Sequence, residues 1–193
     1  MARRSDHTRE ELMDLAIREG LDILDKDGLS GFSARRVAKA MGYTVGTLYH
    51  VFGDLDHYML HVNARILDGW HEDLSRRLKR SKKDPLIFLA QAYIDFARRH
   101  YNRWTTLFEF RMAGKAPLPG WYTEKLGRLF ELVEAAILPH SGGDTQKARR
   151  DAKVLWAGIH GICVLSLSGK LDIVGAEKTE VLVNSLLDRY ITT

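Results

Sequence analysis

Apolar residues recur along almost the whole chain at the three- and four-residue intervals of an α-helix, and no other feature of the sequence constrains the fold as strongly. No stretch sustains the apolar and polar alternation of a half-buried strand. The pattern predicts an all-α protein of about nine helices. Four of these follow Thr8, Ser33, Thr44 and Asp54, and the others occupy residues 85–101, 103–112, 119–138, 145–168 and 177–190.

The ends of the first helices carry residues that favour helix boundaries. Short polar side chains suit N-caps, and glycine suits the residue after a helix. Gly20 lies on the apolar stripe of the first helix, where its missing side chain would let another helix approach closely. The predicted caps are Thr8 in a capping box with Glu11, then Ser33, Thr44 and Asp54 at N-termini, and Gly28 and Gly42 at C-termini.

Composition excludes several classes of protein. The chain has 193 residues, of which 45% are hydrophobic and 28% are charged, and this is enough to bury a hydrophobic core. We expect one compact chain with at most two units. The single cysteine, Cys163, cannot form an intrachain disulfide, so a reducing, cytoplasmic setting is expected. The basic N-terminus is followed by no apolar region of a signal peptide, and the longest nearly uncharged run, 154–169, is too short to span a membrane. That run is expected to form a buried helix.

The stretch SARRVAKAMGYTVGTLYHVFG, residues 33–53, holds three basic residues and no acidic one. By contrast, residues 1–32 hold five basic and eight acidic residues, and the whole chain has a net charge of +4. Two short helices joined by a turn at Gly42 have the spacing of a helix-turn-helix, whose second helix enters the DNA major groove. A carboxylate there would face the phosphates, which explains why the stretch lacks acid.

This N-terminal block resembles the TetR family of bacterial transcriptional regulators. The resemblance covers residues 8–70 and is carried by the segments DKDGLSGFS, RVAKAMG and TVGTLYHVFGD, with Gly28, Ala38, Gly42, Gly46, Leu48, Tyr49 and Phe52 at matching positions. The segment LWAGIHGI, residues 155–162, looks like the Trp, His and Gly signature of one subgroup of the family's C-terminal domains.

The resemblance implies a three-domain layout and a DNA-reading helix. Residues 1–53 would form the helix-turn-helix domain, 54–83 a connecting helix, and 84–193 a helical domain for ligand binding and dimerisation. Residues 45–51 become the recognition helix. The DNA-binding residues expected from it are Arg35, Arg36, Lys39, Thr44, Val45, Gly46, Thr47, Tyr49 and His50.

One position departs from the family pattern. Members commonly carry a phosphate-binding Lys just after the N-cap of the fourth helix, and this chain has Leu55 there, between Asp54 and Asp56. DNA affinity is therefore expected to depend more on the basic residues of the second helix and of the N-terminal tail, which are Arg35, Arg36, Lys39, Arg3 and Arg4.

In the C-terminal part, the family generally has a ligand cavity and a dimer interface made by the last two long helices. Segments 154–168 and 181–191 are apolar enough for that interface. Aromatic residues crowd the middle of this region and serve either as core or as cavity lining. The predicted ligand-binding residues are Phe96, Trp104, Phe108, Met112, Trp121, Trp156 and His160.

Other motifs give little support to an enzyme. His57 and His61 have the spacing of a metal pair or of a solvated pair, and no further ligand motif accompanies them, so no metal and no cofactor is expected. No nucleophile elbow or phosphate-binding glycine loop occurs. The sequence predicts a cytoplasmic homodimeric repressor that a small molecule releases from its operator. The alternatives are a helical small-molecule-binding or enzymatic protein with a vestigial DNA-binding head, and a plain helical dimerisation module.

Overall fold

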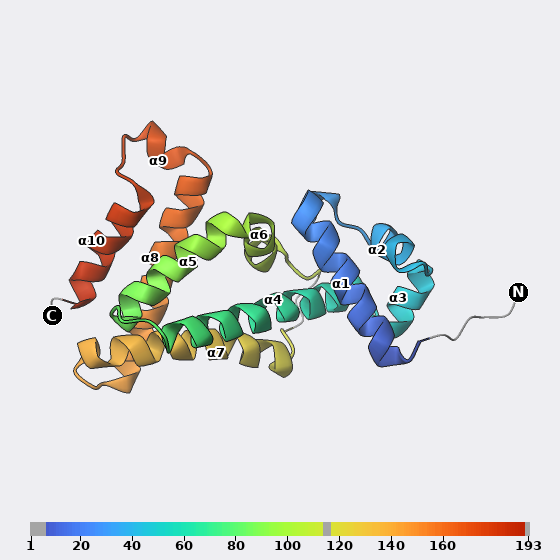
Figure 1. The fold of residues 1–193 in the computed structure, drawn as a ribbon, viewed down its shortest axis with the longest axis horizontal. Helices are drawn as coiled ribbons and strands as arrows, with labels where there is room; N and C mark the ends of the chain where they lie inside the picture. The colour runs from blue at the N-terminus through green and yellow to red at the C-terminus, as the bar shows by residue number, and fades with distance from the viewer. Residues whose placement is uncertain (1–6, 114–116, 192–193) are drawn as a thin grey trace, which may run out of the picture. The chain divides into compact units, whose positions relative to one another are not determined.

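The computed structural model describes residues 7–113 and 117–191, and all regular elements in these residues are helices (Figure 1). The all-α prediction is confirmed. Ten α-helices occur in these two stretches in place of about nine, because the single turn α9 forms in the loop before the last helix. In order they are α1 (Arg9–Asp27), η1 (Leu29–Gly31), α2 (Ala34–Met41), α3 (Val45–Phe52), α4 (Leu55–Leu78), α5 (Pro85–Arg99), α6 (Tyr101–Glu109), α7 (Gly120–Ile137), η2 (Leu138–Ser141), α8 (Thr145–Leu167), α9 (Lys170–Ile173) and α10 (Thr179–Ile191).

The chain divides into two compact units. The first unit comprises residues 1–68 and 100–122, and the second comprises 69–99 and 123–193. Helix α6 therefore packs with the first unit, and the basic segment 76–84 lies inside the second. The predicted domain limits at 53/54 and 83/84 do not coincide with these units, and the assignment of separate functions to residues 1–53, 54–83 and 84–193 stays a prediction.

The core of the first unit forms where α1, α2, α3 and the start of α4 meet. Tyr58 of α4 is fully buried, and its hydroxyl donates a 2.7 Å hydrogen bond to the Ala16 carbonyl of α1. A Cβ at Gly20 would stand 2.0 Å from that hydroxyl, so only glycine allows this crossing. The predicted close approach of a second helix at Gly20 is confirmed.

Local capping interactions fix where the first four helices begin. The capping box between Thr8 and Glu11 is present. The Ser33 and Thr44 hydroxyls accept hydrogen bonds from the third backbone amide of their helices, at 3.3 and 3.2 Å. Asp54 Oδ1 accepts from the His57 amide at 2.8 Å, and this bond is the main reason why the pKa of Asp54 is lowered. All four predicted N-caps are confirmed.

Helix α6 is held against α1 by polar contacts within the first unit. The guanidinium of Arg103 donates to both carboxylate oxygens of Asp25, at 2.7 and 2.6 Å, and Asn102 donates to the Asp25 carbonyl at 3.0 Å. Beyond the end of α6, the Ala113 amide donates to Asp56 at 2.6 Å. Both carboxylates beside Leu55 therefore accept hydrogen bonds inside the first unit.

In the second unit, α5, α8 and α10 pack against one another. Leu155, Ile159 and Cys163 form the buried face of α8, and burial raises the pKa of the Cys163 thiol to about 11. A Cβ at Gly158 would come within 2.7 Å of the Leu186 side chain of α10, so α10 lies close to α8 at this glycine. Gly161 has nothing within 4 Å of a Cβ position in the described residues.

The expectation that residues 154–169 form a buried helix is wrong for one face of α8. Val154, Val164 and Leu165 are exposed by 54%, 42% and 41%, because they point away from the side that packs on α5 and α10. None of the helices in the described residues is both long and apolar enough to cross a membrane.

Candidate DNA interface

The turn between α2 and α3 sets the geometry of a helix-turn-helix. Gly42 takes the left-handed conformation, with φ of 76°, which an L-residue with a side chain rarely adopts. The Tyr43 amide donates back to the Ala38 carbonyl at 2.9 Å, so the chain leaves α2 sharply. Thr44 then caps α3 only three residues after α2 has ended.

The N-terminus of α3 presents hydroxyls and free helix-start amides. Thr44 Oγ1 and Thr47 Oγ1 lie 3.1 Å apart, which is within hydrogen-bonding distance. The first amides of a helix have no intrahelical partner and attract anions. Among the described residues, a Cβ at Gly46 would meet only Thr44 Oγ1, at 3.6 Å. The fold itself does not require glycine at position 46, whereas a phosphate backbone approaching closely would.

The predicted DNA-binding residues lie together on α2 and α3, and most of them are exposed. One side of α3 is buried in the core through Leu48, Val51 and Phe52. On the opposite side, Tyr49 is 39% exposed and His50 is exposed. Val45 is half-buried and packs against the core. Thr47 is half-buried as well, and the exposed members of the predicted set are Arg35, Arg36, Lys39, Thr44, Gly46, Tyr49 and His50.

The basic residues of α2 differ in what they contact. Arg36 donates through Nη1 to the Gly31 carbonyl at 2.5 Å and through Nη2 to Asp27, so it joins α2 to the end of α1 and to η1. Arg35 and Lys39 are exposed, and their side chains make no hydrogen bond or ion pair within the described part of the chain. Arg35 and Lys39 can turn to a phosphate without breaking an internal contact, and Arg36 cannot.

Two contacts that the sequence did not predict hold α3 and the turn before it in place. Arg9 of α1 donates to the Val51 carbonyl at 3.0 Å, which satisfies a carbonyl at the C-terminal end of α3. His7 Nδ1 lies 2.8 Å from the Tyr43 hydroxyl at the turn. Both pairs join residues far apart in sequence, so no local pattern signals them. The tail residues Arg3 and Arg4, which were expected to support DNA binding, lie outside the described residues.

Leu55 cannot replace the phosphate-binding lysine of the family. It is half-buried and packs against the core of the first unit. Asp54 beside it is committed to capping α4, and Asp56 accepts from Ala113. The N-terminus of α4 therefore presents apolar and acidic side chains.

The structure divides the predicted ligand-binding residues between the two units. Trp104, Phe108, Met112 and Trp121 belong to the first unit, and Phe96, Trp156 and His160 to the second. In the second unit, Trp156 stacks on His160 with ring centroids 5.5 Å apart, and Phe96 stacks on Trp70 at 4.2 Å.

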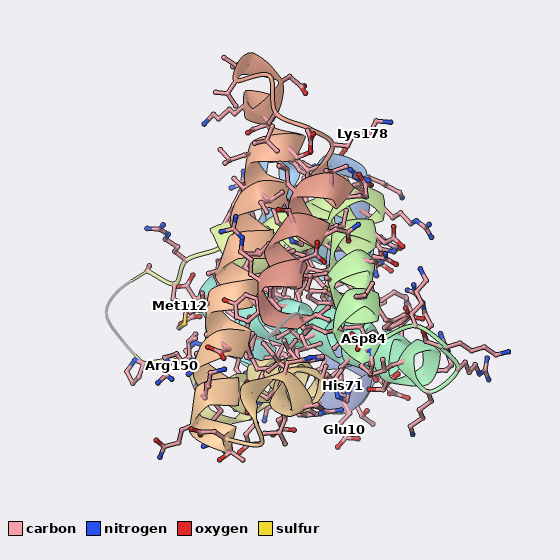
Figure 2. All side chains as sticks on the ribbon, turned by 90° about the vertical axis from the view of Figure 1, so that its left-hand side faces the viewer. Glu10, His71, Asp84, Met112, Arg150 and Lys178 are labelled. Carbon is pink, nitrogen blue, oxygen red and sulfur yellow. The ribbon has the colours of Figure 1, made fainter. Side chains whose placement is uncertain are left out.

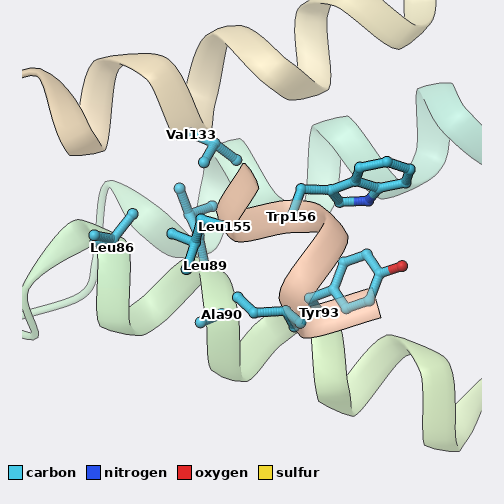
Figure 3. A pocket seen from close by; sticks show the side chains of 8 residues that line it. Leu86, Leu89, Ala90, Tyr93, Val133, Leu155 and Trp156 are labelled. Atoms are coloured by element: carbon cyan, nitrogen blue, oxygen red, sulfur yellow. The ribbon is translucent and has the colours of Figure 1, made fainter. Parts of the chain in front are cut away.

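A pocket lies among α5, α7 and α8 of the second unit (Figure 3). Of the predicted ligand-binding residues, only Trp156 lines it. The α5 residues that line the pocket recur at helical spacing. This spacing could have identified them as one apolar face of the helix, but it could not have identified the empty space beside that face. The lining side chains are Leu86, Leu89, Ala90, Tyr93, Val133, Leu155, Trp156 and Ile159.

The histidine pair on α4 makes protein contacts. His57 Nδ1 lies 2.9 Å from Asp54 Oδ1, and His61 stacks on Trp121 with ring centroids 4.7 Å apart. Residues 7–113 and 117–191 contain no group of three or more His, Cys, Asp or Glu side chains that could hold a metal.

Residues 86–190 match the family described as Tetracyclin repressor-like, C-terminal domain. Because this match spans more than half of the chain, the protein belongs to that family. The chain is also 24% identical over 178 residues to the uncharacterized HTH-type transcriptional regulator Rv0681 of Mycobacterium tuberculosis, covering 92% of this chain and 78% of that protein.

Solved structures share the fold at lower identity. A protein with unknown function from Rhodococcus sp. RHA1 has 20% identity and a TM-score of 0.73, with 98% of this chain and 97% of that chain covered. FadR of Thermus thermophilus, a TetR family transcriptional repressor in complex with lauroyl-CoA, has 15% identity and a TM-score of 0.64, with 93% of each chain covered. The predicted TetR-like DNA-binding regulator is confirmed, and the Trp, His and Gly subgroup stays a prediction.

Proposed function

We propose that the protein is a homodimeric repressor that a small molecule releases from its operator. The observation that carries this proposal is the α2–α3 pair, in which a three-residue turn, an open glycine and accessible polar residues share one face. Helix α3 would lie in the major groove and read base edges through Tyr49 and His50. Arg35, Lys39 and the α3 N-terminus would bind phosphates.

A dimer would place two such helices on successive half-sites, about 34–36 Å apart or further if the heads are splayed. The surface that supports dimerisation lies on α8 and α10, which run side by side (Figure 2). Val154, Gly161 and Val164 recur at helical spacing on α8, and Val181 of α10 is 45% exposed. An apolar stripe of this kind is suited to a second copy of the same helices.

Release from the operator would follow from a shift between two states. A ligand that binds better to the state with wrongly spaced heads draws the dimer away from DNA. The FadR of Thermus thermophilus, a repressor solved with a bound acyl-CoA, supports an effector for this chain as well. The relatives are regulators, and we therefore assign this chain no catalytic activity and no cofactor. We also assign it a cytoplasmic location. Trp156, His160 and Gly161 support membership of the Trp, His and Gly subgroup.

A footprint on the DNA upstream of the protein's own gene tests the proposal. The wild-type protein is expected to protect a pseudo-palindromic site, and Tyr49→Ala or His50→Ala is expected to change operator preference or abolish specific protection. Failure of the wild type to distinguish this DNA from unrelated DNA of equal length would favour the alternative of a vestigial head. Footprints of both variants identical to that of the wild type would remove Tyr49 and His50 from base recognition.

A further inference from the structure

The most basic stretch of the chain lies outside the helices proposed to read DNA. Residues 74–83, LSRRLKRSKK, hold six basic residues and no acidic one, whereas residues 33–53 hold three basic residues. The stretch covers the C-terminal turn of α4 and the loop that leads to α5, and it belongs to the second unit. Figure 2 shows side chains with nitrogen tips projecting from this part of the chain, beside Asp84. We call residues 74–83 the basic turn.

Hydrogen bonds to the backbone fix the shape of the basic turn. The Lys79 amide donates to the Ser75 carbonyl at 3.3 Å, which completes the last turn of α4. The Lys83 amide donates to the Ser81 hydroxyl at 3.1 Å in the loop. Because the cations are attached to an ordered backbone, holding them against a partner costs less conformational entropy than in a flexible tail.

Half of the basic side chains are engaged within the protein. Arg76 and Arg77 donate to the two carboxylate oxygens of Asp73, at 2.7 and 3.0 Å. Lys83 donates to Gln91 of α5 at 2.6 Å. These three side chains therefore have partners of their own.

The other three basic side chains, those of Lys79, Arg80 and Lys82, are exposed and unpaired. They make no hydrogen bond or ion pair with any residue that the structure describes. The carboxylates that flank the stretch are already used, because Asp73 pairs with two arginines and Asp84 accepts from two amides of α5 at 2.8 and 3.2 Å. The basic turn can therefore contact an anion through three cations without breaking an internal bond.

The surroundings of these cations favour a polyanion over a bilayer or a protein surface. Every exposed residue of the basic turn is Lys or Arg, and Leu74 and Leu78 are buried and half-buried. The turn thus has no exposed apolar side chain to insert into a membrane or to form the centre of a protein interface. Duplex DNA carries one charge per about 1.7 Å of its axis, and Lys and Arg bind its phosphates without regard to sequence. A regulator already held on DNA meets neighbouring phosphates at a high local concentration.

We propose that the basic turn binds the phosphate backbone of duplex DNA, as a second, sequence-independent contact in addition to that of α2 and α3. Lys79, Arg80 and Lys82 carry the contact, which adds affinity for any duplex. The choice of sequence stays with α2 and α3. This contact goes beyond the repressor function proposed above, because it requires neither a dimer nor an effector.

Lysine acylation read by mass spectrometry tests the contact on the intact protein. The probe is a duplex of about 40 base pairs of arbitrary sequence, in excess and at low salt. Lys79 and Lys82 are expected to react at least about fivefold more slowly with the duplex present, because a bound phosphate covers the amine. Lys170 and Lys178 are exposed in the same unit and should react at an unchanged rate. Unchanged reactivity of Lys79 and Lys82 overturns the proposal.

Salt dependence separates a defined contact from a general effect of charge. A turn variant that neutralises the three unpaired cations should reduce the slope of log affinity against log salt by about 2 to 3 on the same duplex, because each phosphate contact contributes about 0.9. A matched variant removes equal charge from exposed positions of the second unit and should keep the wild-type slope. A wild-type slope in the turn variant, or an equal loss in both variants, overturns the proposal. The two variants are Lys79→Gln/Arg80→Gln/Lys82→Gln and Arg150→Gln/Lys170→Gln/Lys178→Gln.

Two other anions test whether the partner is DNA. Vesicles with about 30% phosphatidylglycerol, and polyglutamate, are added at the same concentration of negative charge as the duplex. Both are expected to protect Lys79 and Lys82 less than the duplex does. Equal or stronger protection by the vesicles would identify a membrane surface as the partner, and by polyglutamate an acidic protein segment. Either result overturns the assignment to DNA.

The footprint on upstream DNA separates the second contact from the proposed repressor. Specific footprinting by a wild-type protein whose Lys79 and Lys82 stay unprotected leaves the repressor intact and ends the proposal of a second contact. Protection of both lysines in a protein that distinguishes no DNA sequence has the opposite meaning. When both hold, the turn variant is expected to give the wild-type footprint at a higher protein concentration, because α2 and α3 still select the sequence.

Discussion

The two compact units expose opposite kinds of surface. On α2 and α3 of the first unit the large aliphatic side chains pack toward the core, and most exposed residues are basic, hydroxyl-bearing or aromatic with a polar edge. On α8 to α10 of the second unit, large aliphatic residues remain exposed, with Ile173 at 82% and Val174 at 74%. A polar, acid-free face suits a polyanion, whereas an aliphatic face suits another protein surface or a hydrocarbon.

The largest effect is expected from placing a charge on the apolar face of the second unit. Val164→Asp should convert the dimer to a monomer, because two carboxylates would be desolvated at a symmetric interface. Operator affinity should then fall by about 100-fold or more, since each half-site is bound separately. Analytical ultracentrifugation and a gel shift measure the two effects.

Ala135→Asp on α7 is the matched control, because it adds the same charge at an exposed position of the same unit. It should remain dimeric. A Val164→Asp protein that stays dimeric at low micromolar concentration would contradict the assignment of the interface to α8.

The next effect separates DNA binding from stability at one residue. Gly46→Ala fits the fold, because its Cβ would meet only Thr44 Oγ1. Removing a helical glycine should raise the free energy of unfolding by up to about 1 kcal/mol. The same methyl group would obstruct a phosphate at the α3 N-terminus and lower operator affinity on the order of tenfold.

Gly69→Ala on α4 provides the comparison, since that position is also helical and has open space around it. It should stabilise the protein without altering DNA binding. Thermal unfolding and a gel shift on both variants decide the matter, and unchanged operator affinity in Gly46→Ala would exclude a close backbone approach there.

A smaller effect distinguishes the neighbouring arginines of α2. Arg35→Ala should weaken binding to all DNA sequences and reduce the slope of log affinity against log salt by about 1. Arg36→Ala should instead lower thermal stability, because the contacts with Gly31 and Asp27 are lost, and should leave the salt slope unchanged. A salt slope unchanged in Arg35→Ala would remove Arg35 from the DNA interface.

The first unit was the more predictable of the two because its boundaries are set locally. The caps at Thr8, Ser33 and Thr44 and the turn at Gly42 each depend on residues within four positions, so their spacing in the sequence is sufficient. The accessible face of α3 follows from the same periodicity. The contacts of Arg36 with Gly31 and Asp27 could not be predicted in this way, because these partners lie five and nine residues away and the sequence around Arg36 is typical of a phosphate ligand.

Contacts between distant segments could not be predicted. Arg103 and Asp25 are 78 residues apart, and only packing brings α6 into the first unit. The pocket depends on where α7 and α8 leave space beside α5, which periodicity does not encode. An aromatic residue at helical spacing is equally consistent with core and with cavity lining, and among the predicted set only Trp156 lines the pocket.

The smallest effect concerns the titration of His160 beside that pocket. Because burial lowers its pKa from 6.5, the unfolded chain takes up a proton at a higher pH than the folded protein does. Its contribution to stability is therefore fully present above pH 6.5 and is lost as the pH falls toward the folded-state pKa, with a slope of at most about 1.4 kcal/mol per pH unit. His160→Gln, which cannot take up a proton, should show a flatter loss of unfolding free energy on acidification. Denaturant titrations on both sides of that pH measure the difference, and parallel curves for the two proteins would show that the imidazole is as easily protonated in the folded state as in water.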